Sequence, residues 1–132
     1  MEQAISTLIK GDIISVDTDA TIAEVAHLLR NHNVTYVPVV ESDGQIFGII
    51  TARDMIHFHS SGRSSKAVRA WEICTHKTIE VSPDKPVHAV ALLMVEHHIH
   101  HVLVSEGGIL RGVISSFDLV EKYMLSAMLE AA

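Results

Sequence analysis

The sequence predicts an α/β (α+β) fold in which two β-α-β-β-α repeats pack sheet to sheet with pseudo-two-fold symmetry. The first observation is a duplication: Val25 recurs as Val90, an offset of 90 − 25 = 65, and neighbouring apolar positions recur with it. The second is the stretch 48–54, which recurs as 112–118 at an offset of 112 − 48 = 64. A repeat of this size leaves one face of its small sheet uncovered, so the repeats should pack through those faces.

The composition fits one compact domain with an aliphatic core. Of the 132 residues, 48% are hydrophobic and only 5% aromatic, which is enough to support a fold without disulfides or a structural metal. The single cysteine, Cys74, excludes an internal disulfide and a cysteine-based zinc cage. The net charge is −6 and no Lys/Arg cluster stands out, which argues against nucleic acid as a partner.

The chain is expected to be cytoplasmic. Its first residues lack the basic and apolar regions of a signal peptide. No apolar run approaches the roughly 20 residues that cross a bilayer. We therefore expect no membrane partner.

The first repeat is predicted over residues 1–59. Thr21, with Glu24 three residues later, forms the capping box of a helix whose apolar positions recur at i, i+3 and i+4. Pro38 lies inside a run of β-branched residues, which predicts an edge or end position in the sheet. In order, the expected elements are a short helix over 1–10 ended by Gly11, a strand over 13–16, a helix from Thr21, a strand over 34–40, a hairpin turn at 42–44, a strand over 45–50 and a helix over 52–59.

The second repeat is predicted over residues 68–132, after a polar linker at 60–67. The linker is rich in serine and contains one glycine, which is typical of a connection. The same order of elements then starts again. The expected elements are a short helical approach over 68–74, a strand over 78–81, a helix opened by 82–86, strands over 102–105 and 109–114, and a final helix from about 117 towards 130.

The duplicated stretch ends in a Thr/Ser-x-x-Asp step, Thr51 to Asp54 and Ser115 to Asp118. Each step follows an apolar run, which predicts a buried strand that turns into the start of a helix. Two interpretations fit. The hydroxyl and carboxylate form a helix capping box, or they hold the hydroxyls of a sugar. One residue can serve both purposes.

The order of these motifs resembles a tandem pair of CBS domains, named after cystathionine β-synthase and often called a Bateman module. The resemblance covers nearly the whole chain. Repeat 2 departs from the pattern at Leu103, where the family often has proline. The residues that carry the resemblance are 16–22, 36–40, 43–44 and 48–54 in repeat 1, and 81–84, Gly108 and 112–118 in repeat 2.

The resemblance implies a regulatory module, not an enzyme, that binds an adenosyl ligand in clefts between the repeats. The ligand would be AMP, ADP, ATP or S-adenosylmethionine, and no cofactor is required. The implied site A combines Thr51, Arg53 and Asp54 with Ile79, Ile99, His100 and His101, and the implied site B combines Ser115 and Asp118 with Ile14, Val34, Thr35 and Tyr36. Because site A contains Arg53 and two histidines, it is favoured for a phosphorylated nucleotide.

Other functions compete with ligand sensing. A structural or protein-interaction module would keep the fold without a ligand. An enzyme is not favoured, because no nucleophile elbow, His-Glu-x-x-His motif or glycine-rich phosphate loop is present. A homodimer is expected from the resemblance, and otherwise the output would pass through an unidentified effector protein. Two interpretations fit the apolar stripe on the last helix, a part of the core or, as the resemblance favours, an oligomer face; its residues are Met124, Leu125, Met128 and Leu129.

The run from His97 to His101 also admits a metal-site interpretation, since imidazole binds zinc, nickel and copper. The alternative is that His97 and His98 end a helix, where imidazolium suits the dipole. His100 and His101 would then begin a strand and point to opposite faces. We expect no metal site, because such a run does not readily supply convergent ligands.

Overall fold

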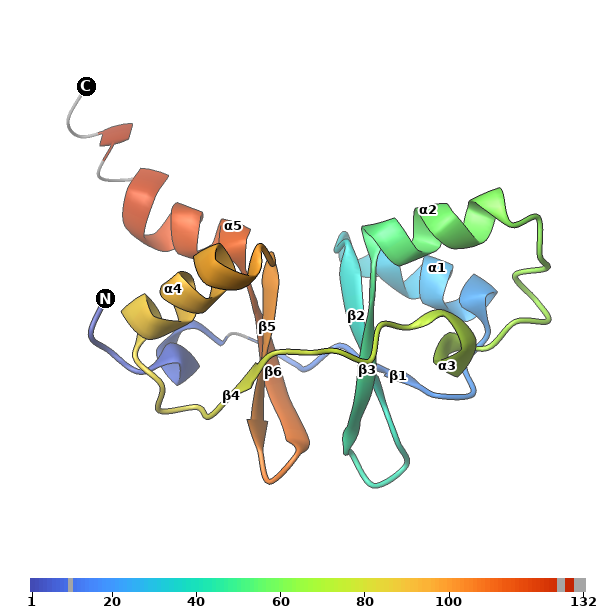
Figure 1. Cartoon of the computed structure of the whole chain (residues 1–132), viewed down its shortest axis with the longest axis horizontal. Helices are drawn as coiled ribbons and strands as arrows, with labels where there is room; N and C mark the ends of the chain where they lie inside the picture. The colour runs from blue at the N-terminus through green and yellow to red at the C-terminus, as the bar shows by residue number, and fades with distance from the viewer. Residues whose placement is uncertain (10, 126–127, 130–132) are drawn as a thin grey trace. The chain divides into compact units, whose positions relative to one another are not determined.

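The structure, a computed structural model, describes residues 1–9, 11–125 and 128–129 (Figure 1). The chain divides into two compact units: unit 1 comprises Met1–Ile13 with Ile79–Ala132, and unit 2 comprises Ile14–Thr78. Each unit contains one three-stranded sheet with helices. This confirms the predicted α/β repeats. The expected packing of one sheet on the other stays a prediction.

Unit 2 holds the first copy of the repeated motif. Its sheet has the order β1-β2-β3, with β1 parallel and β3 antiparallel to the middle strand. Figure 1 shows α2 leaving the end of β3. The elements are β1 (Val16–Asp17), α1 (Ile22–His32), β2 (Tyr36–Val40), β3 (Ile46–Thr51), α2 (Ala52–Ser60) and α3 (Ala70–Ile73).

Unit 1 repeats this topology with the sheet order β4-β5-β6. The predicted final helix begins as α5 but continues as a π-helical segment, and part of its expected course towards Glu130 lies outside the described residues. The elements are η1 (Ile5–Leu8), β4 (Glu80–Val81), α4 (Val87–His97), β5 (His101–Glu106), β6 (Ile109–Ser115), α5 (Ser116–Leu119) and η2 (Val120–Leu125).

The short segment that opens each repeat packs on the sheet of the other repeat. Ile5 is fully buried in the core that contains Val81 and Val87, and its N–H donates to Lys85 O at 2.7 Å. The compact units group segments by their contacts in space, whereas the division into 1–59, 60–67 and 68–132 follows the sequence and stays a prediction. The sequence shows which positions of these segments are apolar, but not which sheet they cover.

The predicted linker is also part of unit 2. Ala23 N–H donates to Ser65 O at 2.9 Å, and Ile22 N–H donates to Val68 O at 3.0 Å. These bonds satisfy N–H groups at the start of α1 that have no partner inside the helix. Backbone hydrogen bonds therefore hold the stretch after α2 against the start of α1.

Two local predictions have different outcomes. The capping box of α1 is confirmed in its hydroxyl half, because Glu24 N–H donates to Thr21 Oγ1 at 3.1 Å. The edge position predicted for Pro38 is wrong: Pro38 is buried in the middle strand of its sheet. The sheet accommodates it because β1 pairs only with Val39 and Val40, so the parallel ladder begins after the proline.

No helix among the residues that the structure describes is long and apolar enough to cross a membrane.

Candidate functional site

The side chain of Asp54 lies in the first turn of α2, directly after β3 ends at Thr51. The backbone N–H of Thr51 donates to Asp54 Oδ2 at 2.9 Å, and the Thr51 hydroxyl donates to the same oxygen at 3.2 Å. The carboxylate therefore caps the helix, as the first interpretation of the motif predicts. Both bonds use Oδ2.

Thr75 is a further partner of Asp54. Its hydroxyl donates to Oδ1 at 3.1 Å and lies 3.3 Å from Oδ2. Thr75 reaches this place because it forms an antiparallel bridge with Ile49 on β3. A contact between residues this far apart leaves no local sequence signal. Since an ionised carboxylate has about four lone-pair sites, Asp54 can still accept a bond from a ligand hydroxyl.

The same bridge explains the glycine that opens the motif. A Cβ on Gly48 would lie 2.7 Å from the backbone oxygen of Thr75 and 2.9 Å from the sulfur of Cys74. In unit 1, a Cβ on Gly112 would lie 2.9 Å from the side chain of Ile9. Each motif glycine therefore makes room for the opening segment that crosses its strand.

A pocket of about 450 Å³ opens beside Asp54, wholly within unit 2. Its apolar lining residues are Phe58, which is buried, and Ile73, which is half-buried. The remaining lining is polar or charged. The residues that line the pocket are Arg53, Asp54, His57, Phe58, Ser61, Arg63, Glu72 and Ile73.

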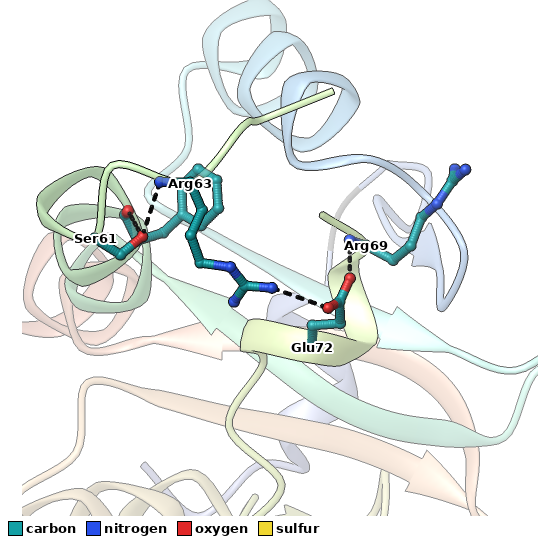
Figure 2. A network of polar contacts seen from close by, with 5 residues as sticks. Ser61, Arg63, Arg69 and Glu72 are labelled. Carbon is teal, nitrogen blue, oxygen red and sulfur yellow. Dashed lines mark hydrogen bonds and ion pairs between the residues drawn. The ribbon is translucent and has the colours of Figure 1, made fainter. Parts of the chain in front are cut away.

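One wall of the pocket is an ion pair between Arg63 and Glu72. Arg63 Nη2 lies 3.0 Å from Glu72 Oε1, and the backbone N–H of Arg69 donates to Oε2 at 2.7 Å. The Arg69 backbone bond lowers the pKa of Glu72 most, and Arg63 lowers it further against a desolvation effect. Figure 2 shows both donors directed at the Glu72 carboxylate, and the Arg63 backbone bonded to Ser61.

The second copy of the motif, in unit 1, is a complete capping box. Ser115 N–H donates to Asp118 Oδ2 at 2.8 Å, and Asp118 N–H donates to Ser115 Oγ at 3.2 Å. The matching position to Arg53 is Phe117, which is 62% exposed. The two copies therefore share the cap and differ in charge.

His101 lies opposite Ser115 in the β5–β6 ladder. Burial lowers the pKa of its imidazole, and His100 lowers it further, whereas Asp118 raises it. His100 is exposed and its backbone oxygen accepts from Ser116 N–H at 2.8 Å.

The structure distributes the predicted site residues over both units. Within unit 2, Tyr36 pairs with Thr51, just as His101 pairs with Ser115 in unit 1. Each predicted site draws on both units, so the assembly of sites A and B stays a prediction. Unit 2 holds Thr51, Arg53, Asp54, Ile14, Val34, Thr35 and Tyr36, and unit 1 holds Ser115, Asp118, Ile79, Ile99, His100 and His101.

The histidine run ends α4, as the helix-end interpretation predicts. His98 is the C-cap residue, with a left-handed φ of 53°, and His97 is the last helical residue. Within the described part of the chain, no three His, Cys, Asp or Glu side chains are placed to hold a metal ion.

Two units of one topology, each with a Thr/Ser-x-x-Asp cap at the end of its sheet, define a tandem α/β repeat protein. The family model described as CBS domain matches residues 5–61 and again residues 70–125. The chain therefore belongs to the CBS domain family and contains two such domains. This confirms the resemblance drawn from the sequence.

Solved structures of CBS proteins are similar over almost the full chain. A CBS domain protein from Pyrobaculum aerophilum complexed with AMP is 29% identical, with a TM-score of 0.84 and coverage of 98% of this chain and 99% of that one. The CBS domain pair of protein MJ0100, in complex with 5′-methylthioadenosine and S-adenosyl-L-methionine, is 25% identical, with a TM-score of 0.81 and coverage of 99% and 98%.

Curated relatives are similar at the sequence level. An uncharacterized protein of Methanopyrus kandleri is 29% identical over 131 residues, which are 96% of this chain and 67% of the relative. A homoserine O-acetyltransferase of Methanococcus vannielii is 25% identical over 119 residues, but these are only 24% of that enzyme. The chain thus matches a minor part of the enzymes among its relatives.

Proposed function

We propose that this chain is a regulatory module that binds an adenosyl ligand and signals through its conformation or its dimer state. The ligand is AMP, ADP, ATP or S-adenosylmethionine. The AMP complex of a 29% identical CBS protein that matches 98% of this chain supports the ligand class. The observation that carries the proposal is the Asp54 carboxylate, which is fixed by Thr51 and Thr75 and still has acceptor capacity.

The chemistry of this carboxylate suits a ribose. An ionised carboxylate forms charge-assisted hydrogen bonds with hydroxyl groups, and these are stronger than bonds between neutral groups. Asp54 also lies beside Arg53, a cation that suits a phosphate. Asp118 has the same cap but Phe117 beside it, so we propose Asp54 as the ribose acceptor of the occupied site, with Asp118 serving chiefly as a cap.

Isothermal titration with the four adenosyl ligands tests the proposal. We expect the native chain to bind at least one of them, Asp54→Asn to lose most of the affinity, and Asp118→Asn to retain it. Asp43→Asn, in the hairpin turn of unit 2, is the control for loss of a surface charge. The absence of binding by any ligand at millimolar concentration would contradict the proposal, and loss of binding only in Asp118→Asn would move the site to the second copy.

Signalling requires that the ligand binds two states of the chain with different affinity. We propose that the module is not itself an enzyme, and that its output passes to an effector protein or to a second copy of the chain. Recovery of unchanged nucleotide after prolonged incubation is expected. Hydrolysis products that form in proportion to protein concentration would contradict this.

A structural or dimerisation module is the alternative function. It is favoured by exposed apolar side chains on α4, where Leu92 is 54% and Val95 is 71% exposed. The two functions are separated by whether the oligomeric state responds to adenosyl ligands. A ligand-insensitive dimer that binds none of them would favour the alternative.

A further inference from the structure

The last helical segment of unit 1, α5 with η2, carries apolar side chains on its outer face as well as on its inner face. Leu119 is buried in the core of unit 1, and Tyr123 packs against that core. The side-chain amide of Gln3 also donates to the Tyr123 hydroxyl, so the inner face of the segment is held in place. The exposed apolar residues of the same segment are Phe117, Met124 and Leu125.

The first copy of the repeat shows that the fold does not require apolar residues at these positions. α2 follows β3 in unit 2 as α5 follows β6 in unit 1. At the offset of 64, the counterparts of Phe117, Met124 and Leu125 are Arg53, Ser60 and Ser61 (117 − 64 = 53, 124 − 64 = 60, 125 − 64 = 61). All three counterparts are polar. An exposed apolar surface that one copy has and the other lacks is typical of an interaction site.

The backbone also changes form at this surface. α5 has only four residues and continues as the π-helical segment η2 (Val120–Leu125), which contains Met124 and Leu125. The π-helical conformation is rare, and where it occurs it is frequently found at functional sites. The structure therefore combines an uncovered apolar face with an unusual helical turn.

A carboxylate lies among these apolar side chains. Glu121 is exposed and is four residues from Phe117 and four residues from Leu125, a spacing at which helical side chains share a face. α4 packs against α5 (Figure 1). α4, α5 and η2 contain no arginine and one lysine, Lys122. The outer face of the last segment is therefore apolar and acidic.

Negative charge extends over the whole of unit 1. Residues 1–13 and 79–132 contain four Lys/Arg and nine Asp/Glu, a net charge of 4 − 9 = −5. Such a surface attracts a partner that carries lysine or arginine. A second copy bound at this same face would instead repeat Glu121 on both sides of the contact and place like charges together. The face thus differs from the apolar side chains on α4 that a dimer would use.

We propose that the outer face of α5 and η2, formed by Phe117, Glu121, Met124 and Leu125, docks an amphipathic helix of an effector protein that carries apolar and basic residues on one side. The inference rests on the part of the proposed function that passes the output to an effector protein, and it adds the surface and the chemistry of the partner. A helix is the expected occupant because its side-chain ridges fit between those of another helix. The flexible thioether of Met124 adapts to the partner's side chains, and a basic residue opposite Glu121 fixes the register of the two helices.

The test uses two synthetic helical peptides that share the same leucine positions, one with lysine and one with glutamate at the remaining positions. In titration calorimetry, we expect the full chain to bind the lysine peptide and not the glutamate peptide. Phe117→Gln and Leu125→Gln should each weaken binding about tenfold, as for the loss of an apolar anchor in an interface. Glu121→Gln should weaken binding about threefold and reduce its dependence on salt concentration.

Ile56→Gln and Glu41→Gln are the matched controls. Ile56 is an exposed apolar residue on α2, and Glu41 is an exposed acid of unit 2. They report non-specific contact between a cationic peptide and an acidic chain, so both should keep the native affinity. Circular dichroism verifies that every variant remains folded.

Three results would overturn the proposal. The lysine peptide does not bind, or it binds Phe117→Gln and Leu125→Gln as tightly as the native chain. The two variants lower the mass of the native assembly in light scattering, in which case a second copy covers the face. The native chain binds vesicles of phosphatidylcholine and phosphatidylserine and the two variants do not, in which case the face contacts a membrane.

The peptide titration requires no adenosyl ligand, so its outcome is separate from that of the proposed ligand sensing. A chain that binds the lysine peptide through this face but binds none of the four ligands would support the docking surface and contradict ligand sensing. A chain that binds an adenosyl ligand but not the peptide would contradict the docking surface alone.

Discussion

The hydroxyl of Thr75 lies 3.1 Å from Oδ1 of Asp54 and joins the segment after α3 to the first turn of α2. The bond spans 21 residues of sequence. It fixes the one oxygen of Asp54 that the capping box leaves free. The orientation of the proposed ribose acceptor therefore depends on a segment that belongs to the second repeat in sequence and to unit 2 in space.

Thr75→Val should weaken adenosyl binding by about threefold to tenfold, because one hydrogen bond that orients the carboxylate is lost. Thr75 is exposed, so the free energy of unfolding should change by less than about 1 kcal/mol. Titration calorimetry measures the first quantity and urea denaturation the second. Thr75→Ser keeps the hydroxyl and should restore affinity. Tighter binding by the valine variant would instead mean that Thr75 competes with the ribose.

Gly48→Ala should destabilise the chain more than Gly112→Ala. The new methyl group meets the Thr75 backbone oxygen at 2.7 Å in the first case and the flexible side chain of Ile9 at 2.9 Å in the second. We expect a loss of about 2 kcal/mol for Gly48→Ala, typical of overpacking, and about 1 kcal/mol or less for Gly112→Ala. Chemical denaturation of the two variants gives both values. Equal losses would contradict the role given to the rigid backbone contact.

The contacts of Gly48 also mark the limit of prediction from the sequence. Local patterns gave the capping boxes and the duplication gave the repeated topology, because both depend on residues at short or constant spacing. The sequence did not reveal Thr75, nor the exchange of opening segments that buries Ile5 in unit 1. These depend on which sheet an apolar segment covers. The prediction of an edge or end position for Pro38 was wrong because β1, the parallel strand beside it, has only two residues and is too short for a sequence pattern to detect.

The free energy of unfolding should decrease as the pH falls below about 6.5, in part because of His101. In the folded chain, burial lowers the pKa of His101 below its ordinary value of 6.5. The unfolded chain then binds the proton more readily, so the stabilising contribution of neutral His101 is complete above pH 6.5 and is lost as the pH falls towards the lowered folded pKa.

His101→Gln removes the titrating imidazole, so the free energy of unfolding should decrease less as the pH falls. Urea midpoints at pH 7.5 and pH 5.5 measure it, and His27→Gln, at an exposed position on α1, is the matched control. If the native chain and His101→Gln lose stability in parallel between these two conditions, His101 does not contribute.

Ser115→Ala should reduce stability without an effect on nucleotide affinity. The hydroxyl of Ser115 accepts from Asp118 N–H at 3.2 Å at the start of α5, and loss of such a cap costs about 1 kcal/mol. If Asp118 serves only as a cap, binding at Asp54 is unchanged. Ser42→Ala, in the exposed hairpin turn, is the control for stability. A loss of affinity in folded Ser115→Ala would assign the occupied site to the second copy.

Leu92 and Val95 provide the test of the proposed homodimer. They are 54% and 71% exposed on α4, and the offset of 65 places His27 and Arg30 at the matching positions of α1 (92 − 65 = 27, 95 − 65 = 30). The fold therefore tolerates polar residues there, so the apolar pair on α4 is not required by packing within the unit. Exposed apolar side chains that cluster on one helix face are typical of an interface.

Leu92→Glu and Val95→Glu should convert a dimer to a monomer in light scattering at micromolar concentration, because each places a charge in a surface that excludes water. Arg30→Glu, on the corresponding face of α1, should leave the oligomeric state unchanged. Circular dichroism of the variants verifies that they remain folded. If both α4 variants keep the mass of the native assembly, the dimer forms through another surface. If the native chain is itself a monomer, the ligand must signal to an effector protein and not to a second copy.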